Sequence, residues 1–149
     1  MTRGQAWARA LATLLTALAA DQASKQLVDS RLMRGESVNV FLGIDLTNTR
    51  NRGVAFGALE GSGVVVGVLI GLALVLLLAY FAANATKPWL WLPVGLLLGG
   101  ALGNLADRAR EGAVIDFIDP LFWPAFNLAD AMIVIGVLAL LYVVEGRRE

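Results

Sequence analysis

Three aspartates lie in a stretch of the sequence that is otherwise apolar and aromatic. Asp116, Asp119 and Asp130 occur within AVIDFIDPLFWPAFNLADAMI. A carboxylate is costly to remove from water unless it is paired or protonated. The chain contains no cysteine and no histidine, so thiol and imidazole chemistry are excluded, as are the commonest metal ligands. Any catalysis must therefore use carboxylates, hydroxyls, lysine or backbone groups, and neither a metal site nor a cofactor is expected.

The three aspartates have different local interpretations. Asp119 precedes Pro120, a dipeptide that is typical of a turn. Asp130 follows Asn127 by three residues at the start of an apolar run, a spacing close to that of a helix capping box. Asp116 lies in the apolar tetrapeptide VIDF, where no helix end requires a carboxylate.

Asp116 and Asp130 are candidates for an acid–base pair. The chain leaves one apolar segment before Asp116 and enters another at Asp130, so the connection between them can bring the two carboxylates together. Two adjacent carboxylates do not both ionise cheaply, so one keeps a proton while the other accepts one from water. This chemistry is that of an aspartic hydrolase, although a purely structural cap at Asp130 fits the spacing as well.

The composition indicates that these residues belong to a membrane protein. Of the 149 residues, 58% are hydrophobic and 16% are charged, against about 45–50% and about 25% in soluble domains. Crossing the hydrocarbon takes about 20 residues of helix. The pattern predicts one mainly α domain over residues 1–149, with four transmembrane helices at about 7–29, 63–84, 88–107 and 127–146.

The first of these helices has an alternative interpretation. Arg3 and Arg9 precede a short apolar run that ends in ALAADQ, as in a cleavable signal peptide. However, the helical pattern continues past this point, and Asp21 and Lys25 have the i,i+4 spacing of an ion pair. We therefore expect a retained helix.

The connections between the helices predict the orientation and a small β-rich element. Basic residues are denser in the short segments on the side of the termini, which predicts cytoplasmic termini. Alternation in VNVFLGIDLT predicts short strands within about 36–60, on the extracytoplasmic side between the first two helices. The unusual polar groups then all lie at the outer membrane face.

The third apolar segment ends with further polar candidates. Asn104 lies one helical turn before Arg108, whose guanidinium at headgroup depth suits a phosphate, a carboxylate or a carbonyl. Asp107 is expected to form an ion pair with Arg108 that holds the helix end. Gly100 and its neighbouring glycines indicate close helix packing, or a smooth surface for a substrate.

Four motifs in this order resemble those of bacterial lipoprotein signal peptidase, the signal peptidase II family. They are DQASK, NRGVAF, GGALGNLADRAREGAVIDF and FNLADAMIVIG, and the match covers nearly the whole chain. The resemblance implies an aspartic endopeptidase with Asp116 and Asp130 as the catalytic pair. The supporting positions that it implies are Asn51, Gly53, Asn104, Arg108, Asn127, Asp21 and Lys25.

The resemblance also implies a substrate and a location. The enzyme would remove the signal peptide from a diacylglyceryl-modified prolipoprotein, cutting before the lipidated cysteine. It would be a multi-pass monomer in the bacterial cytoplasmic membrane, in contact with lipid and without a nucleic-acid partner. The sequence departs from the family pattern at Val54, where a small alanine is usual, and in the short connection over residues 117–126.

Two other function classes fit parts of the sequence. A serine–lysine protease would use Ser24 and Lys25, but adjacent residues on a helix point about 100° apart. A proton-relaying transporter would use Asp21, Asp116 and Asp130. Such relays usually lie near the middle of the membrane, whereas these residues are predicted near one face.

Overall fold

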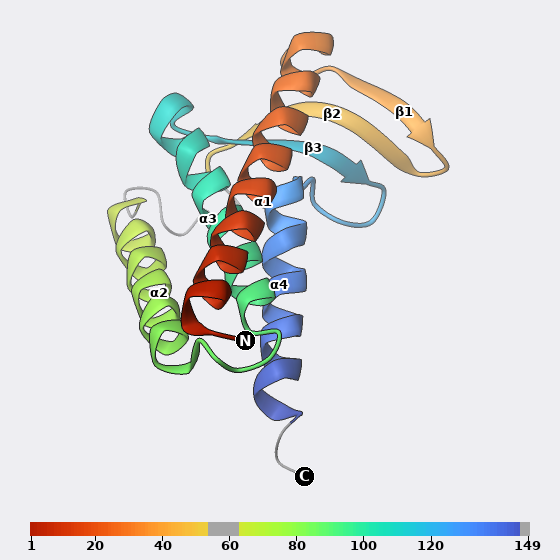
Figure 1. The fold of residues 1–149 in the computed structure, drawn as a ribbon. Helices are drawn as coiled ribbons and strands as arrows, with labels where there is room; N and C mark the ends of the chain where they lie inside the picture. Colours follow the sequence, from red (N-terminus) through yellow and green to blue (C-terminus); the bar gives the residue numbers. More distant parts are fainter. Residues whose placement is uncertain (54–62, 147–149) are drawn as a thin grey trace.

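The computed structural model describes residues 1–53 and 63–146. Four helices make up most of this part of the chain (Figure 1). The expectation about Val54 concerns a residue outside the described part. The helices are α1 (Arg3–Arg31), α2 (Gly63–Asn84), α3 (Trp91–Glu111) and α4 (Leu128–Glu145).

Helix α3 is the centre of the bundle. It packs along α1 on one side and along α4 on the other, while α2 lies to one side of these three helices (Figure 1). A buried cluster that includes Phe81, Leu90 and Val94 joins the end of α2 to α1 and α3. Helix α3 begins at Trp91 rather than at the expected Pro88, because the residues before it form turns.

Glycines allow this close packing of α3. A Cβ atom added to Gly99 would lie 2.6 Å from the Cβ of Ala17 on α1. One added to Gly100 would lie 2.7 Å from the carbonyl oxygen of Ala129 on α4. Gly100 therefore acts in helix packing, directly beside the residue that precedes Asp130.

We expect Gly100→Ala to destabilise the protein, with Gly71→Ala as the matched control. The added methyl group at position 100 meets a backbone carbonyl, and overpacking of this kind costs about 1–3 kcal/mol. At Gly71 on α2 a Cβ meets nothing within 4 Å, so alanine there should be neutral or stabilising. Thermal unfolding in detergent measures both variants, and equal melting temperatures would contradict the packing role.

A three-stranded antiparallel sheet crosses one end of the bundle (Figure 1). Its strands are β1 (Ser37–Phe41), β2 (Ile44–Asn51) and β3 (Val114–Pro120), in that order. The sequence placed the β-rich element between the first two helices alone. The third strand corrects that prediction, because VIDF pairs with β2 from a distant part of the chain and places Asp116 opposite Thr49.

The sheet is attached to the helices by ion pairs at one end of β2. Arg50 donates to Asp29 of α1 at 2.5 Å and to Glu111 of α3 at 2.6 Å. The start of α1 and the end of α4 lie at the opposite end of the bundle (Figure 1). The sheet therefore lies at the end of the bundle away from the two chain termini (Figure 1).

Two of the four helices are long and apolar enough to cross a membrane by length and composition. The segments are Gly67–Asn84 of α2 and Leu128–Glu145 of α4. Few of their residues are buried inside the protein, so most of their apolar side chains face outward. This exposure suits helices whose surroundings are lipid.

Candidate active site

Asp116 lies in β3 and is held by two amide groups. Its side chain accepts hydrogen bonds from Asn127 at 2.8 Å and from Asn51 at 2.9 Å. The residue is only 3% exposed. It comes from a strand and not from a turn or a cap, so its burial serves no helix end.

Asp130 lies in the first turn of α4, where it completes a capping box with Asn127. The Asn127 side chain accepts from the backbone N–H of Asp130 at 2.9 Å, and the Asp130 carboxylate accepts from the backbone N–H of Asn127 at 3.2 Å. The other carboxylate oxygen accepts from Asn104 at 2.8 Å. The predicted cap is confirmed, and the same carboxylate also belongs to a larger polar network.

Asn127 and Asn104 connect the two carboxylates. The Nδ2 atom of Asn127 donates to Asp116 at 2.8 Å and to the side-chain oxygen of Asn104 at 3.1 Å. Asn104 in turn donates to Asp130. The structure thus brings Asp116 and Asp130 into one hydrogen-bonded group from β3 and α4.

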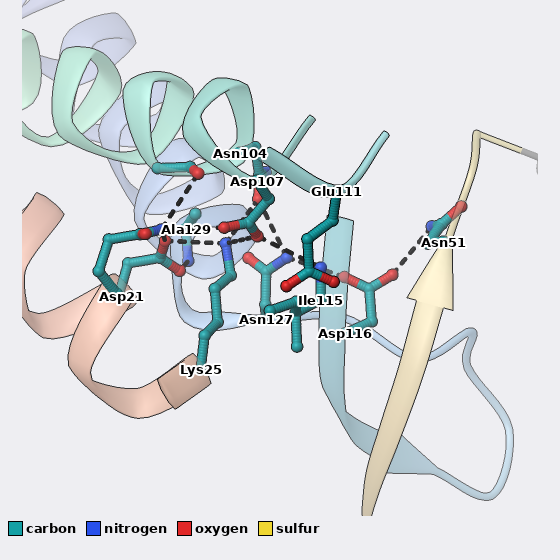
Figure 2. Close-up of polar contacts among 12 residues, drawn as sticks. Asp21, Lys25, Asn51, Asn104, Asp107, Glu111, Ile115, Asp116, Asn127 and Ala129 are labelled. Atoms are coloured by element: carbon teal, nitrogen blue, oxygen red, sulfur yellow. Dashed lines mark hydrogen bonds and ion pairs between the residues drawn. The ribbon is translucent and has the colours of Figure 1, made fainter. Parts of the chain in front are cut away.

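Lys25 contacts this group through Asn104 and belongs to a buried ion cluster (Figure 2). Its ammonium group contacts Asp21 at 2.8 Å, Asp107 at 2.8 Å and the side-chain oxygen of Asn104 at 3.0 Å. The predicted pair between Asp21 and Lys25 is confirmed. Among the described residues, no buried side-chain nitrogen or oxygen lacks a hydrogen-bond partner, as a stable polar network requires.

Lys25 determines which way both asparagine amides face. An ammonium group can only donate, so the Asn104 atom that it contacts must be the oxygen. The Nδ2 of Asn104 then faces Asp130, and the Nδ2 of Asn127 faces Asn104 and Asp116. The cation therefore directs N–H donors at both carboxylates.

Gly53 fixes the third amide at the site. Its backbone has φ +83°, a conformation that favours glycine. Its N–H donates to the side-chain oxygen of Asn51 at 2.8 Å, which leaves the Nδ2 of Asn51 to donate to Asp116 (Figure 2). Gly53 therefore positions Asn51.

The surroundings of Asp116 favour its protonated form. Burial raises the pKa of the Asp116 carboxyl above its ordinary value, and the nearby charge of Asp130 adds to this effect. Hydrogen bonds from Asn51 and Asn127 and the charge of Lys25 lower the pKa, and they offset the rise only in part. Asp130 is less buried than Asp116 and lies in the first turn of α4.

The structure corrects the expected partner of Asp107 and adds a residue that sequence reasoning missed. Asp107 pairs with Lys25 and Arg110, not with its neighbour Arg108. Gln22 donates to Asp21 and to Asp107, both at 3.1 Å. Its position in the DQASK motif could have indicated a role at the site. The residue type alone did not show that Gln22 connects α1 to α3.

Two other residues proved to be outside the polar network. Asp119 lies in the last part of β3 rather than in a turn, and the turn begins at Pro120. Ser24 donates to the backbone oxygen of Asp21 at 2.7 Å. The ammonium of Lys25 instead contacts Asp21, Asp107 and Asn104. This geometry contradicts a serine–lysine dyad.

An apolar cavity of about 550 Å³ lies between α2, α3 and α4. Most of its lining is aliphatic, with Leu74, Leu97 and Ile133 among the lining residues, and Asn104 and Arg108 are its polar members. Arg108 is exposed and belongs to this cavity rather than to the hydrogen bonds around Asp116. Because Asn104 also donates to Asp130, the cavity and the carboxylates are adjacent.

Comparison with known proteins identifies related membrane enzymes. A family model described as signal peptidase (SPase) II matches residues 13–144. A lipoprotein signal peptidase of Moorella thermoacetica is 45% identical over 128 residues, which cover 85% of each chain. Another, from Citrobacter koseri, is 36% identical over 142 residues, covering 89% of this chain and 86% of the relative. A solved structure described as a bacterial membrane enzyme matches with a TM-score of 0.83 at 28% sequence identity. The match covers 94% of this chain and 93% of the chain in that structure.

Proposed function

The chain belongs to the signal peptidase II family, whose members remove signal peptides from lipoproteins, and we propose that Asp116 and Asp130 form its catalytic dyad. The observation that carries the proposal is the bonding of Asn127. Its one side chain donates to Asp116 and caps the helix turn that contains Asp130. Two carboxylates held in this way by neutral amides suit a pair that shares one proton.

In the proposed mechanism Asp130 is the general base and Asp116 the general acid. Asp130 takes a proton from a water molecule, whose oxygen attacks the scissile carbonyl carbon. Asp116 donates its proton to the carbonyl oxygen as the tetrahedral intermediate forms. The carbon–nitrogen bond then breaks, the leaving nitrogen takes the proton from Asp130, and the hydroxyl proton returns to Asp116. The burial of Asp116 supports its role as the protonated acid, and Asp130 is the less buried of the two carboxylates.

The whole chain would serve as a single membrane-embedded domain in which all four helices cross the bilayer. Helix α1 has 29 residues and α3 has 21, which correspond to about 43 Å and about 31 Å, enough for a hydrocarbon layer of about 30 Å. The density of basic residues near the chain ends supports cytoplasmic termini in the bacterial inner membrane. The sheet and the dyad then lie at the outer face.

The substrate would be a diacylglyceryl-modified prolipoprotein, cut before its lipidated cysteine by a monomeric enzyme. The apolar cavity between α2, α3 and α4 supports a substrate that arrives from the lipid. Its polar members, Asn104 and Arg108, would meet the carbonyl and ester groups at the cut. Residues Asp21, Lys25, Asn51 and Gly53 support the dyad without contact with the substrate.

The pH dependence of cleavage tests the role of Asp116 as the acid. Activity should fall as the pH rises through the raised pKa of Asp116, because the acid is then ionised. Asn51→Leu removes an N–H that stabilises the ionised form, so it should raise this pKa further. We therefore expect a lower maximal rate, with the alkaline limb of kcat/KM moved to higher pH.

The measurement uses a diacylglyceryl-modified prolipoprotein and, in parallel, the same protein without the lipid. Thr49→Val is the matched control, because Thr49 lies on the same strand as Asn51 and its hydroxyl bonds to that of Thr47 at 3.1 Å. The control should keep the wild-type profile. An alkaline limb that stays in place or moves to lower pH in Asn51→Leu would refute the acid role, and equal cleavage of both substrates would refute the lipid requirement.

A further inference from the structure

An uncharged apolar surface lies at the end of the sheet that is remote from the ion pairs of Arg50. It consists of Phe41 and Leu42 at the tip of the β1–β2 hairpin and Leu121, Phe122 and Trp123 after β3. We call these five residues the outer apolar patch. They are between 67% and 93% exposed, a degree of exposure that marks an interaction site when large apolar residues are contiguous.

The two loops that carry the patch form one surface. The backbone N–H of Leu121 donates to the carbonyl oxygen of Gly43 at 2.8 Å, which joins the segment after β3 to the hairpin tip. Four of the patch residues, all except Phe41, line a shallow hollow of about 560 Å³ between the loops, together with Gly43 and Pro120. Neither 40–44 nor 120–126 contains a charged residue.

The position of the patch identifies its partner. The segment after β3 lies beside the first turn of α4 (Figure 1), and α4 exposes apolar side chains, such as Ile135 and Leu138, along its length. The patch therefore lies next to a helix whose outer surface is suited to lipid. Tryptophan, present in the patch as Trp123, is also enriched at membrane interfaces.

We propose that the outer apolar patch inserts into the outer leaflet of the membrane and sets the height of the active site above the hydrocarbon. The proposal rests on the topology given under Proposed function. Asp116 lies in β3, the strand that leads into the inserted segment, and Asp130 lies in the first turn of α4, the helix that follows it. Asp45 and Asp119 pair with each other between β2 and β3, next to the hairpin tip. Their charges limit the depth of insertion.

Fluorescence of Trp123 tests the insertion. The chain has four tryptophans, so the variant Trp7→Phe, Trp89→Phe, Trp91→Phe leaves Trp123 alone. It is reconstituted in bilayers of phosphatidylethanolamine and phosphatidylglycerol whose acyl chains carry bromine near the headgroup or near the chain end. We expect stronger quenching by the shallow bromine and protection from aqueous acrylamide. Full quenching by acrylamide with none by bromine would overturn the proposal, as would protection that arises only when a prolipoprotein is added.

Activity separates this proposal from the enzymatic one. Phe122→Asp should lower cleavage of a bilayer-embedded prolipoprotein by about tenfold, since burial of a phenylalanine contributes at least that factor to an equilibrium. Cleavage of the detergent-solubilised substrate should stay unchanged. The control is Met33→Asp, an exposed apolar residue at the end of α1 outside the patch. Equal loss in detergent and bilayer would overturn the height-setting role while leaving the dyad intact.

Discussion

Asp116→Asn and Asp130→Asn should each lower the rate of prolipoprotein cleavage by about 10²–10⁴-fold or more, the contribution typical of a positioned acid or base. An amide cannot accept a proton from water, so the variant at position 130 lacks the base. It also cannot supply the carboxyl proton, so the variant at position 116 lacks the acid. Single-turnover cleavage followed by gel mobility measures both rates.

These losses should occur with the fold intact. Asparagine has the size of aspartate, but its NH2 group must face one of the donors that now bind the carboxylate, such as Asn51 or Asn127 at position 116. An unmatched buried donor costs about 1–3 kcal/mol, which a folded protein can tolerate. Asp119→Asn and Ser24→Ala are the controls and should cleave at the wild-type rate. Wild-type activity in either dyad variant would contradict the assignment.

Lys25→Met should have the largest effect on stability and should abolish cleavage. The change leaves the carboxylates of Asp21 and Asp107 buried without the cation that both contact. Breaking a buried ion pair in this way costs about 3–5 kcal/mol. It also frees the amide of Asn104, which can then turn its oxygen toward Asp130. Thermal unfolding and cleavage are measured on the same preparation.

A second change separates these two effects of Lys25. Adding Asp107→Asn to Lys25→Met removes one of the unpaired charges, so part of the stability should return. Cleavage should not return, because nothing then directs the amide of Asn104. Lys87→Met, at the other end of the bundle near Tyr80, is the matched control and should change neither property. Recovery of activity together with stability would show that Lys25 acts through charge alone.

The local features of the site were predictable because they depend on short spacings. The capping box of Asn127 and Asp130 and the pair of Asp21 and Lys25 are three and four residues apart, and the structure contains both. Periodicity also indicated a mainly helical chain. Such patterns are fixed by the geometry of one helix, so they need no knowledge of the tertiary fold.

The missed features depend on contacts between distant segments. Lys25 of α1 contacts Asp107 of α3. VIDF pairs with β2, although α2 and α3 separate the two strands in the sequence. A four-residue apolar run does not reveal its strand partner. Arg108 shows the same limit, since the structure places it at the cavity between α2, α3 and α4. For Gly100 the sequence left helix packing and a substrate surface open, and the structure places it in the contact between α3 and α4.

The measurement that tests the central claim most directly is the residual cleavage rate of the double variant Asp116→Asn, Asp130→Asn beside the two single variants. Residues that act as one unit are non-additive, so removing both costs little more than removing one. We expect the double variant to cleave at the rate of the slower single variant. Losses that multiply would mean that the two carboxylates act independently, and the shared-proton mechanism would be wrong.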